Sequence, residues 1–103
     1  HEILHTLTIE SKPNAIYRAI TEQNGLRAWW TRLTMAEPTV GYVNEFGFGS
    51  AFKLCMRIDD LEQDERVEWT CISGHEEWEN TRLHFILTPS PDKISTVLQF
   101  QHI

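Results

Sequence analysis

Alternation between apolar and polar positions runs through most of the chain after residue 45, and it constrains the fold more than any other feature. Because successive side chains of a β-strand point to opposite faces, residues at every second position share one face of a sheet. Segments 60–64, 74–77 and 89–92 interrupt the alternation and are typical of hairpin turns. The positions that we place on the shared face are Phe46, Phe48, Phe52, Leu54, Met56, Ile58, Val67, Trp69, Cys71, Leu83, Phe85, Leu87, Ile94, Thr96, Leu98, Phe100 and His102.

The registers of two predicted hairpins test whether this face is continuous. Directly opposed residues in an antiparallel pair point to the same side of the sheet. We pair Ile58 with Val67 across the first turn and Leu87 with Ile94 across the last turn. This pairing keeps the apolar residues at alternate strand positions on one side of the sheet. The chain is therefore predicted to form one long antiparallel meander with a single apolar face.

The segment before the meander combines one strand with helical spacing. Residues 2–10 alternate like a strand, Pro13 suits the first turn of a helix, and apolar residues between 15 and 20 follow helical spacing. Gly25 interrupts that spacing, so we predict two short helices that end near Trp30. About twenty helical residues are too few to cover six or seven strands, and an uncovered apolar face of that size promotes aggregation. We expect the missing cover from a helix beyond the last residue, a second subunit, or strong curling of the sheet.

Several stretches of the chain resemble the START-like superfamily, which is also called SRPBCC or birch-pollen-allergen-type. Within it, the chain is most similar to the family of heat-shock-protein ATPase activator homologues. The similar stretches are residues 9–30, 46–48, 66–71, 78–85 and 95–102. The resemblance implies an α+β helix-grip fold, with residues 1–103 as a single domain: a strand, two short helices, then a curved antiparallel β-meander. Family members continue with a long C-terminal helix that the sheet grips, and this helix is absent from the present sequence.

The charge distribution argues against nucleic acid and anionic membranes as partners. The 103 residues carry a formal net charge of −6, and the nine lysines and arginines are scattered singly, whereas phosphate binding needs clustered positive charge. No apolar run approaches the roughly 20 residues that span a bilayer, and no signal-peptide pattern opens the chain. We expect a soluble protein. Cys55 and Cys71 are predicted on opposite faces, which favours free thiols and a cytoplasmic location.

Two motifs that suggest metal or nucleotide chemistry lack the structural context which that chemistry needs. Residues 1–5 match H-E-x-x-H, but in a strand the two histidines lie roughly 13 Å apart and cannot share a zinc ion. Gly47-Phe48-Gly49 begins like a dinucleotide fingerprint, but no βαβ unit follows, so we interpret the glycines as sites of strand curvature or a bulge. The acidic segment 59–65 lacks the EF-hand pattern. We predict no metal site and no cofactor.

An apolar cavity enclosed by the sheet is the predicted functional site. Aromatic and aliphatic walls with few polar groups suit a small hydrophobic ligand, such as a lipid or a polyketide-like molecule. The candidate lining residues are Trp30, Phe46, Phe48, Leu54, Met56, Trp69, Cys71, Phe85, Leu98, Phe100 and His102. We interpret the Trp29-Trp30 pair mainly as packing between the helices and the sheet rather than as a ligand gate.

Two other function classes remain open. The resemblance implies that some superfamily members are cyclases or dehydratases, and such chemistry needs an acid or base inside the cavity. His102 is the inner-face candidate for that role, and Cys71 is the residue with which it would form a nucleophile pair, but we predict no catalytic residue. The family name implies a co-chaperone that stimulates a heat-shock ATPase. A homodimer is a further expectation, because a second subunit would cover the apolar face.

Overall fold

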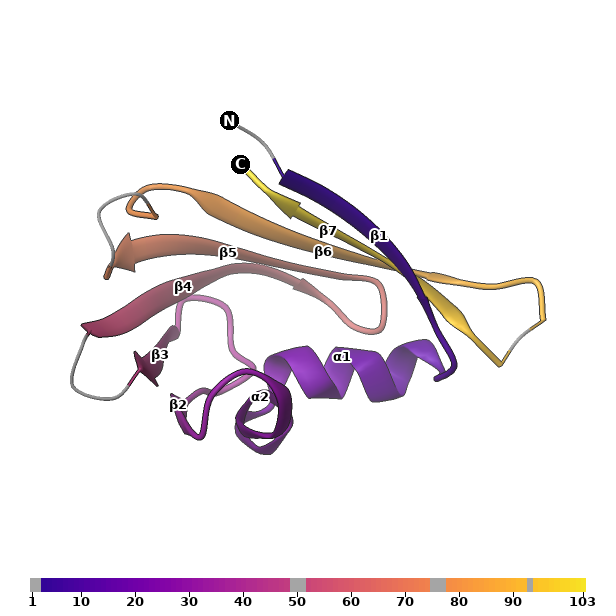
Figure 1. Cartoon of the computed structure of the whole chain (residues 1–103), viewed down its shortest axis with the longest axis horizontal. Coiled ribbons are helices and arrows are strands. Elements are labelled where there is room, and N and C mark those ends of the chain that lie inside the picture. The colour runs from indigo at the N-terminus through magenta and orange to yellow at the C-terminus, as the bar shows by residue number, and fades with distance from the viewer. Residues whose placement is uncertain (1–2, 49–51, 75–77, 93) are drawn as a thin grey trace.

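The computed structural model describes residues 3–48, 52–74, 78–92 and 94–103, without the side chains of Ile3 and Phe52. The elements in chain order are β1 (Ile3–Ile9), α1 (Pro13–Thr21), α2 (Gln23–Trp29), β2 (Leu33–Met35), β3 (Val43–Phe48), β4 (Phe52–Glu62), β5 (Arg66–Ser73), β6 (Arg82–Pro89) and β7 (Thr96–His102). These strands form one antiparallel sheet in the order β1-β7-β6-β5-β4-β3-β2. Figure 1 shows this sheet curving over α1 and α2, which lie on the same side of it. The predicted α+β helix-grip fold is therefore confirmed, and among the described residues no helix follows β7.

The β4–β5 hairpin is longer than the sequence pattern predicts. Ile58 pairs with Trp69 rather than with Val67, so the predicted register is wrong by two residues. The strands continue closer to the turn because the chain reverses tightly around Asp64, whose φ is 62°. A register shift between Ile58 and Asp60 accommodates the extra residue. The apolar face survives the error, since a shift of two residues returns each side chain to the same side.

The β6–β7 hairpin departs from its predicted register by four residues. Leu87 pairs with Leu98 instead of Ile94. The carboxylate of Asp92 accepts hydrogen bonds from the backbone N–H groups of Ile94 and Ser95, and each N···Oδ1 distance is 2.9 Å. These bonds hold Ile94 in the connecting loop, where 64% of it is exposed. A local contact between side chain and backbone thus replaces strand pairing at this end, which alternation alone does not reveal.

The two helices pack tightly against each other. Gly25 lies inside α2, where an added Cβ atom would be only 2.6 Å from the Cα atom of Ala19 in α1. The indole N–H of Trp29 donates a hydrogen bond to the carbonyl oxygen of Ala19 over 2.7 Å and ties the same two helices together. Gly25, which the sequence pattern treats as an interruption, is therefore the close-contact point of the helix pair. Among the described residues, no helix is long and apolar enough to cross a membrane.

Gly47 has a packing role, and of the two predicted alternatives, strand curvature or a bulge, the bulge does not occur there. Strands β3 and β4 pair continuously from Val43 to Phe48, with no register shift at Gly47. An added Cβ atom at Gly47 would lie 2.9 Å from the Cβ atom of Leu33 in β2. The glycine therefore allows the short edge strand to approach β3 closely. Gly49 lies outside the described residues.

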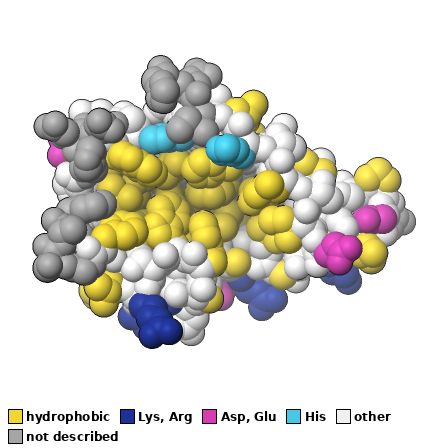
Figure 2. Space-filling view, in the orientation of Figure 1, with side chains coloured by type: hydrophobic (Ala, Val, Ile, Leu, Met, Phe, Trp, Pro, Cys, Tyr) yellow, Lys and Arg dark blue, Asp and Glu magenta, His cyan; other side chains and the backbone are white. Residues whose placement is uncertain are grey.

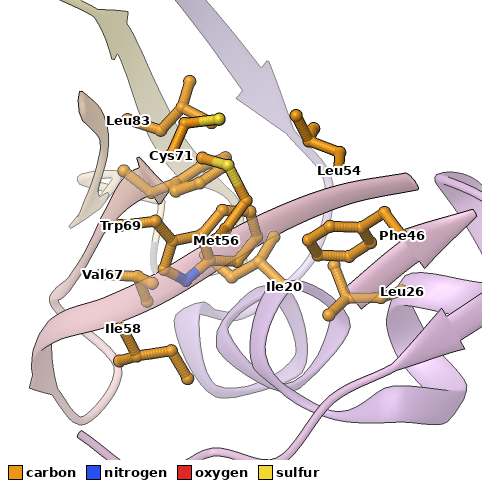
Figure 3. Packing of buried hydrophobic residues seen from close by; sticks show 11 residues of the cluster. Ile20, Leu26, Phe46, Leu54, Met56, Ile58, Val67, Trp69, Cys71 and Leu83 are labelled. Carbon is orange, nitrogen blue, oxygen red and sulfur yellow. The ribbon is translucent and has the colours of Figure 1, made fainter. Parts of the chain in front are cut away.

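The core lies between the helices and the central strands of the sheet. Its buried side chains are Ile20, Leu26, Phe46, Leu54, Met56, Ile58, Val67, Trp69, Cys71, Leu83 and Phe85. Figure 3 shows the Trp69 ring within this cluster, with Phe46 and Leu26 beside each other next to the helices. The inner face is less covered on β1, where Leu7 is 55% exposed. The cover supplied by the helices is thus uneven across the sheet.

Candidate functional site

An apolar groove lies on the inner face of the sheet, between α2 and the strands β1 and β7. Its main hollow has a volume of about 530 Å³ and is lined by His5, Leu7, Trp29, Trp30, Phe48, Trp78, Phe85, Leu98 and Phe100. A second hollow of about 370 Å³ continues it along α1 and shares Leu7, Trp29, Phe85 and Leu98 with it. We call the two hollows together the apolar groove. Figure 2 shows hydrophobic side chains gathered in one patch on this side of the molecule, with histidine side chains at its border.

A continuous series of aromatic rings connects the groove to the core. Trp30 stacks on Phe46, with 4.8 Å between ring centroids, and lies 5.6 Å from Trp69. Trp69 meets Phe85 edge-on at 5.1 Å, and Phe85 lies 5.2 Å from Phe100. Rings at these separations attract one another beyond their buried area. The groove wall is therefore braced by fully buried residues behind it.

A small polar cluster borders one end of the groove. The ring of His102 packs 4.4 Å from that of Trp78, which is part of the groove wall. Nε2 of His102 lies 2.9 Å from the hydroxyl oxygen of Thr81. Burial lowers the pKa of His102, because a partly desolvated imidazole is harder to protonate. His5, a second histidine, stacks on Phe100 at 6.3 Å.

The predicted lining residues fall into three groups in the structure. Trp30, Phe48, Phe85, Leu98 and Phe100 line the apolar groove. Phe46, Leu54, Met56, Trp69 and Cys71 are buried in the core behind it. His102 belongs to the polar cluster beside the wall. Alternation identifies the face that a side chain occupies, but it contains no information on whether a helix covers that part of the face.

The sequence prediction omits four residues that line the main hollow of the groove. These are His5, Leu7, Trp29 and Trp78. Leu7 reaches the groove because β1 pairs with β7, so that Leu7 lies opposite Leu98. The alternation of residues 2–10 was a usable signal, but the partner strand lies at the other end of the chain. Trp29 is 51% exposed while Trp30 stacks on the core, so the two rings have different roles.

The two cysteines are free thiols with different surroundings. Cys71 is buried and Cys55 is partly buried. The Cys71 thiol donates a hydrogen bond to the carbonyl oxygen of Ser73 over 3.5 Å, and burial raises the pKa of this thiol. Within the described part of the chain, Nε2 of His102 bonds to Thr81 and the Cys71 thiol bonds to Ser73, and no hydrogen bond joins Cys71 to His102. This geometry does not activate Cys71 as a nucleophile.

The acidic segment and the histidine motif form no metal centre within the described ranges. Among those residues, no group of three or more His, Cys, Asp or Glu side chains is arranged to hold a metal ion. Arg57 pairs with Asp59 at 2.9 Å and Arg66 pairs with Asp60 at 2.6 Å, so neighbouring arginines offset the acidic charge. His5 lies on β1, and the first two residues of the H-E-x-x-H motif lie outside the described part.

A larger hollow of about 1010 Å³ lies elsewhere, where the start of α1 approaches β5 and β6. Its walls carry charges of both signs, including Lys12 and Arg66 beside Glu62 and Asp64. Mixed charges on an open surface favour no single class of ligand. The apolar groove, in contrast, has the predominantly apolar lining that is typical of small-molecule sites.

Comparisons with known proteins identify similar sequences and structures. A model of the family described as Activator of Hsp90 ATPase homolog 1-like protein matches residues 10–103. No curated protein matches the chain. The solution structure of the Aha1 dimer from Colwellia psychrerythraea is similar over 100% of this chain and 75% of that chain, with a TM-score of 0.89 and 27% identity. The crystal structure of protein MLL2253 from Mesorhizobium loti is similar over 100% of this chain and 76% of that chain, with a TM-score of 0.84 and 18% identity. Protein SSP2350 from Staphylococcus saprophyticus has a TM-score of 0.80 and 12% identity, over 100% of this chain and 70% of that chain.

Proposed function

The chain belongs to the family of Activator of Hsp90 ATPase homolog 1-like proteins, and from that premise we propose that residues 1–103 are one domain which binds small hydrophobic molecules in the apolar groove. The lining of the groove supports this proposal most strongly, because aromatic and aliphatic side chains make up nearly all of it. Small-molecule sites are typically apolar, with a small number of polar groups that orient the ligand. We assign this role to His5, which lines the main hollow, and to His102, whose ring packs against the lining residue Trp78.

Exposed apolar surface in the groove supplies the driving force for binding. Leu7 is 55% exposed and Trp29 is 51% exposed. Covering such surface is worth roughly 25 cal/mol per Å² of apolar area. Because Trp30 is already held against Phe46, the wall loses little side-chain freedom when a ligand binds.

Two leucines of β1 provide matched variants that test the proposal. Leu7 lines the groove and is 55% exposed, whereas Leu4 points to the other face of the same strand and is 62% exposed. Neither residue belongs to the buried core, so Leu7→Gln and Leu4→Gln should fold equally well. We expect isothermal titration calorimetry to show binding of oleic acid or 2-methoxynaphthalene to the wild-type protein. The affinity should fall roughly fivefold in Leu7→Gln, since covering half a leucine is worth about 1 kcal/mol.

Leu4→Gln is the control variant, because Leu4 does not line the groove. Leu4→Gln should bind both compounds as the wild-type protein does. If neither compound binds the wild-type protein, or if the two variants lose the same affinity, the apolar groove is not a ligand site.

A second candidate function is that of a co-chaperone which stimulates the ATPase of a heat-shock protein. The description of the family names an Hsp90 ATPase activator, and a similar solved structure carries the name Aha1. The test is the ATPase rate of the host's Hsp90 with increasing amounts of this chain. An increase that saturates with concentration supports this function. No change in rate, together with no capture of Hsp90 by the immobilised chain, removes it.

We also propose that the chain forms a homodimer, because its groove exposes apolar side chains that a second copy would cover. The similar structure from Colwellia psychrerythraea is described as a dimer, which supports this proposal. Light scattering coupled to gel filtration measures the mass directly. The mass of a single chain at every concentration tested would contradict the proposal.

A further inference from the structure

The tautomer of His102 follows from the hydrogen bonds of Thr81. A threonine hydroxyl carries a single proton, and that of Thr81 is donated to the carbonyl oxygen of Trp78 over 2.5 Å. Nε2 of His102 lies 2.9 Å from the same hydroxyl oxygen, so Nε2 must donate a proton to Thr81. A neutral imidazole carries a proton on only one ring nitrogen. Nδ1 of His102 therefore keeps an unprotonated lone pair.

Backbone hydrogen bonds hold both partners of this contact in place. The N–H group of Cys71 in β5 donates to the carbonyl oxygen of Thr81 over 2.9 Å. Beside His102, the residues Arg82 and Ile103 exchange two backbone hydrogen bonds of 3.0 and 2.9 Å. The hydroxyl and the imidazole are thus positioned by neighbouring strands, and the tautomer is built into the fold.

The unprotonated Nδ1 of His102 is an acceptor on a ring that packs against Trp78, a residue of the groove wall. Nδ1 has no hydrogen-bond partner in the part of the chain that the structure describes. The ring of His102 packs at a tilt against that of Trp78, with 4.4 Å between centroids. Strand alternation places His102 on the same face of β7 as Phe100 and Leu98, and Trp78, Phe100 and Leu98 line the groove. Burial lowers the pKa of His102, which favours the neutral ring near pH 7. An acceptor beside an apolar wall favours a ligand that brings a donor.

We propose that the apolar groove selects hydrophobic molecules that carry a hydroxyl group, such as phenols and hydroxylated polycyclic compounds, and that this hydroxyl donates a hydrogen bond to Nδ1 of His102. The inference rests on the proposed function, since it requires the groove to bind a ligand. A carboxylate is disfavoured at this position, because an ionised carboxylate has no proton to donate and Nδ1 can only accept a hydrogen bond. Thr81 is a positioning residue, which acts by orienting the imidazole.

The protonation pattern is tested without any ligand. Nitrogen-15 NMR of the imidazole in the wild-type protein at pH 7.5 should show a proton on Nε2 and none on Nδ1 of His102. Thr81→Val removes the acceptor for Nε2, so this variant should show a mixture of the two tautomers. A wild-type His102 with its proton on Nδ1 overturns the proposal.

Ligand selection is tested with 2-naphthol and its methyl ether, 2-methoxynaphthalene, which has the same rings but no donor. Calorimetry on the wild-type protein should show 2-naphthol binding about two- to tenfold more tightly than the ether. In His102→Phe, which retains a ring against Trp78, the two affinities should become equal. Thr81→Val should give an intermediate preference. His84→Phe is the matched control, because His84 lies opposite Glu68 on the other face of the sheet, and it should keep the full preference.

The outcomes separate this inference from the proposed function. If both compounds bind the wild-type protein equally well, the groove is a ligand site but does not select a hydroxyl group, and the inference is wrong. The inference is also wrong if His102→Phe keeps the preference. If neither compound binds, the proposed function and this inference fail together.

Discussion

The inner face of the sheet has two halves that carry the same kinds of side chain but differ in their cover. In the covered half, on β3 to β5, Phe46 and Met56 are fully buried. In the open half, on β1 and β7, Leu7 is 55% exposed and Phe100 is only partly buried. Both halves arise from the same alternation of apolar residues. The difference teaches that alternation creates a hydrophobic face, while the helices decide which part becomes core and which part becomes groove.

Truncation in the covered half should have the largest effect. Phe46→Ala removes a fully buried ring that stacks on Trp30 and packs at a tilt against Trp69. We expect the free energy of unfolding to fall by about 3–5 kcal/mol, because the lost burial and the resulting cavity both contribute. Urea denaturation followed by circular dichroism measures this change. A loss below about 1 kcal/mol would mean that the covered half is not a close-packed core.

The helix contact should be the next most sensitive position. Gly25→Ala places a Cβ atom 2.6 Å from the Cα atom of Ala19, and backbone atoms at that distance must move apart. We expect a loss of roughly 1–3 kcal/mol in the same denaturation experiment. Asn24→Ala is the control, since Asn24 is exposed in the same helix and alanine favours helices there. Equal stability of the Gly25→Ala variant and the wild-type protein would show that the helices do not meet this closely.

Truncation of the same residue type in the open half should have a smaller effect. Phe100→Ala removes a ring that remains partly accessible, so less apolar area is lost and no closed cavity forms. We expect a loss of about 1–2 kcal/mol, clearly below that of Phe46→Ala. The ratio of the two losses measures the difference between the halves. Equal losses would mean that the open half is covered in solution, for example by a second copy.

A change of pH should have the smallest effect, through His102. In the unfolded chain a histidine has a pKa of about 6.5, and burial lowers the pKa of His102 in the folded protein. The contribution to stability is therefore complete above about pH 6.5 and is lost as the pH falls towards the folded-state pKa, because the unfolded chain takes up the proton first. Urea denaturation at several values between pH 7.5 and 5.5 should show a smaller decline for His102→Phe than for the wild-type protein. An identical decline in both proteins would contradict this contribution.

The face of each strand could be predicted from sequence because it depends on alternation along that strand and not on the exact pairing register. Ile58 shifted by two positions and Leu87 by four, and both remain on the inner side. The shifts themselves come from the turn at Asp64 and the hydrogen bonds to Asp92, which depend on local geometry that alternation does not describe. The predicted fold therefore stayed correct despite these register errors, whereas the predicted residue pairs across the two hairpins were wrong.

The polar cluster was the least predictable part of the candidate site. Sequence reasoning identified His102 as an inner-face group, but not Thr81 or Trp78 as its partners. Thr81 meets His102 across 21 sequence positions, and Asn80 beside it has a φ of 68°, a conformation for which the alternation contains no signal. Contacts of this kind require both the loop and the pairing of β6 with β7 to be known.

Residue order alone was sufficient to assign the sheet, the two helices and the shared apolar face, because strand and helix periodicity are properties of neighbouring residues. Tertiary packing determined the rest. The pairing of β1 with β7 brought Leu7 opposite Leu98, and the close contact at Gly25 set where the helices lie. Depth below the surface depends on these long-range contacts, and so Phe46 became part of the core while Phe100 became part of the groove wall.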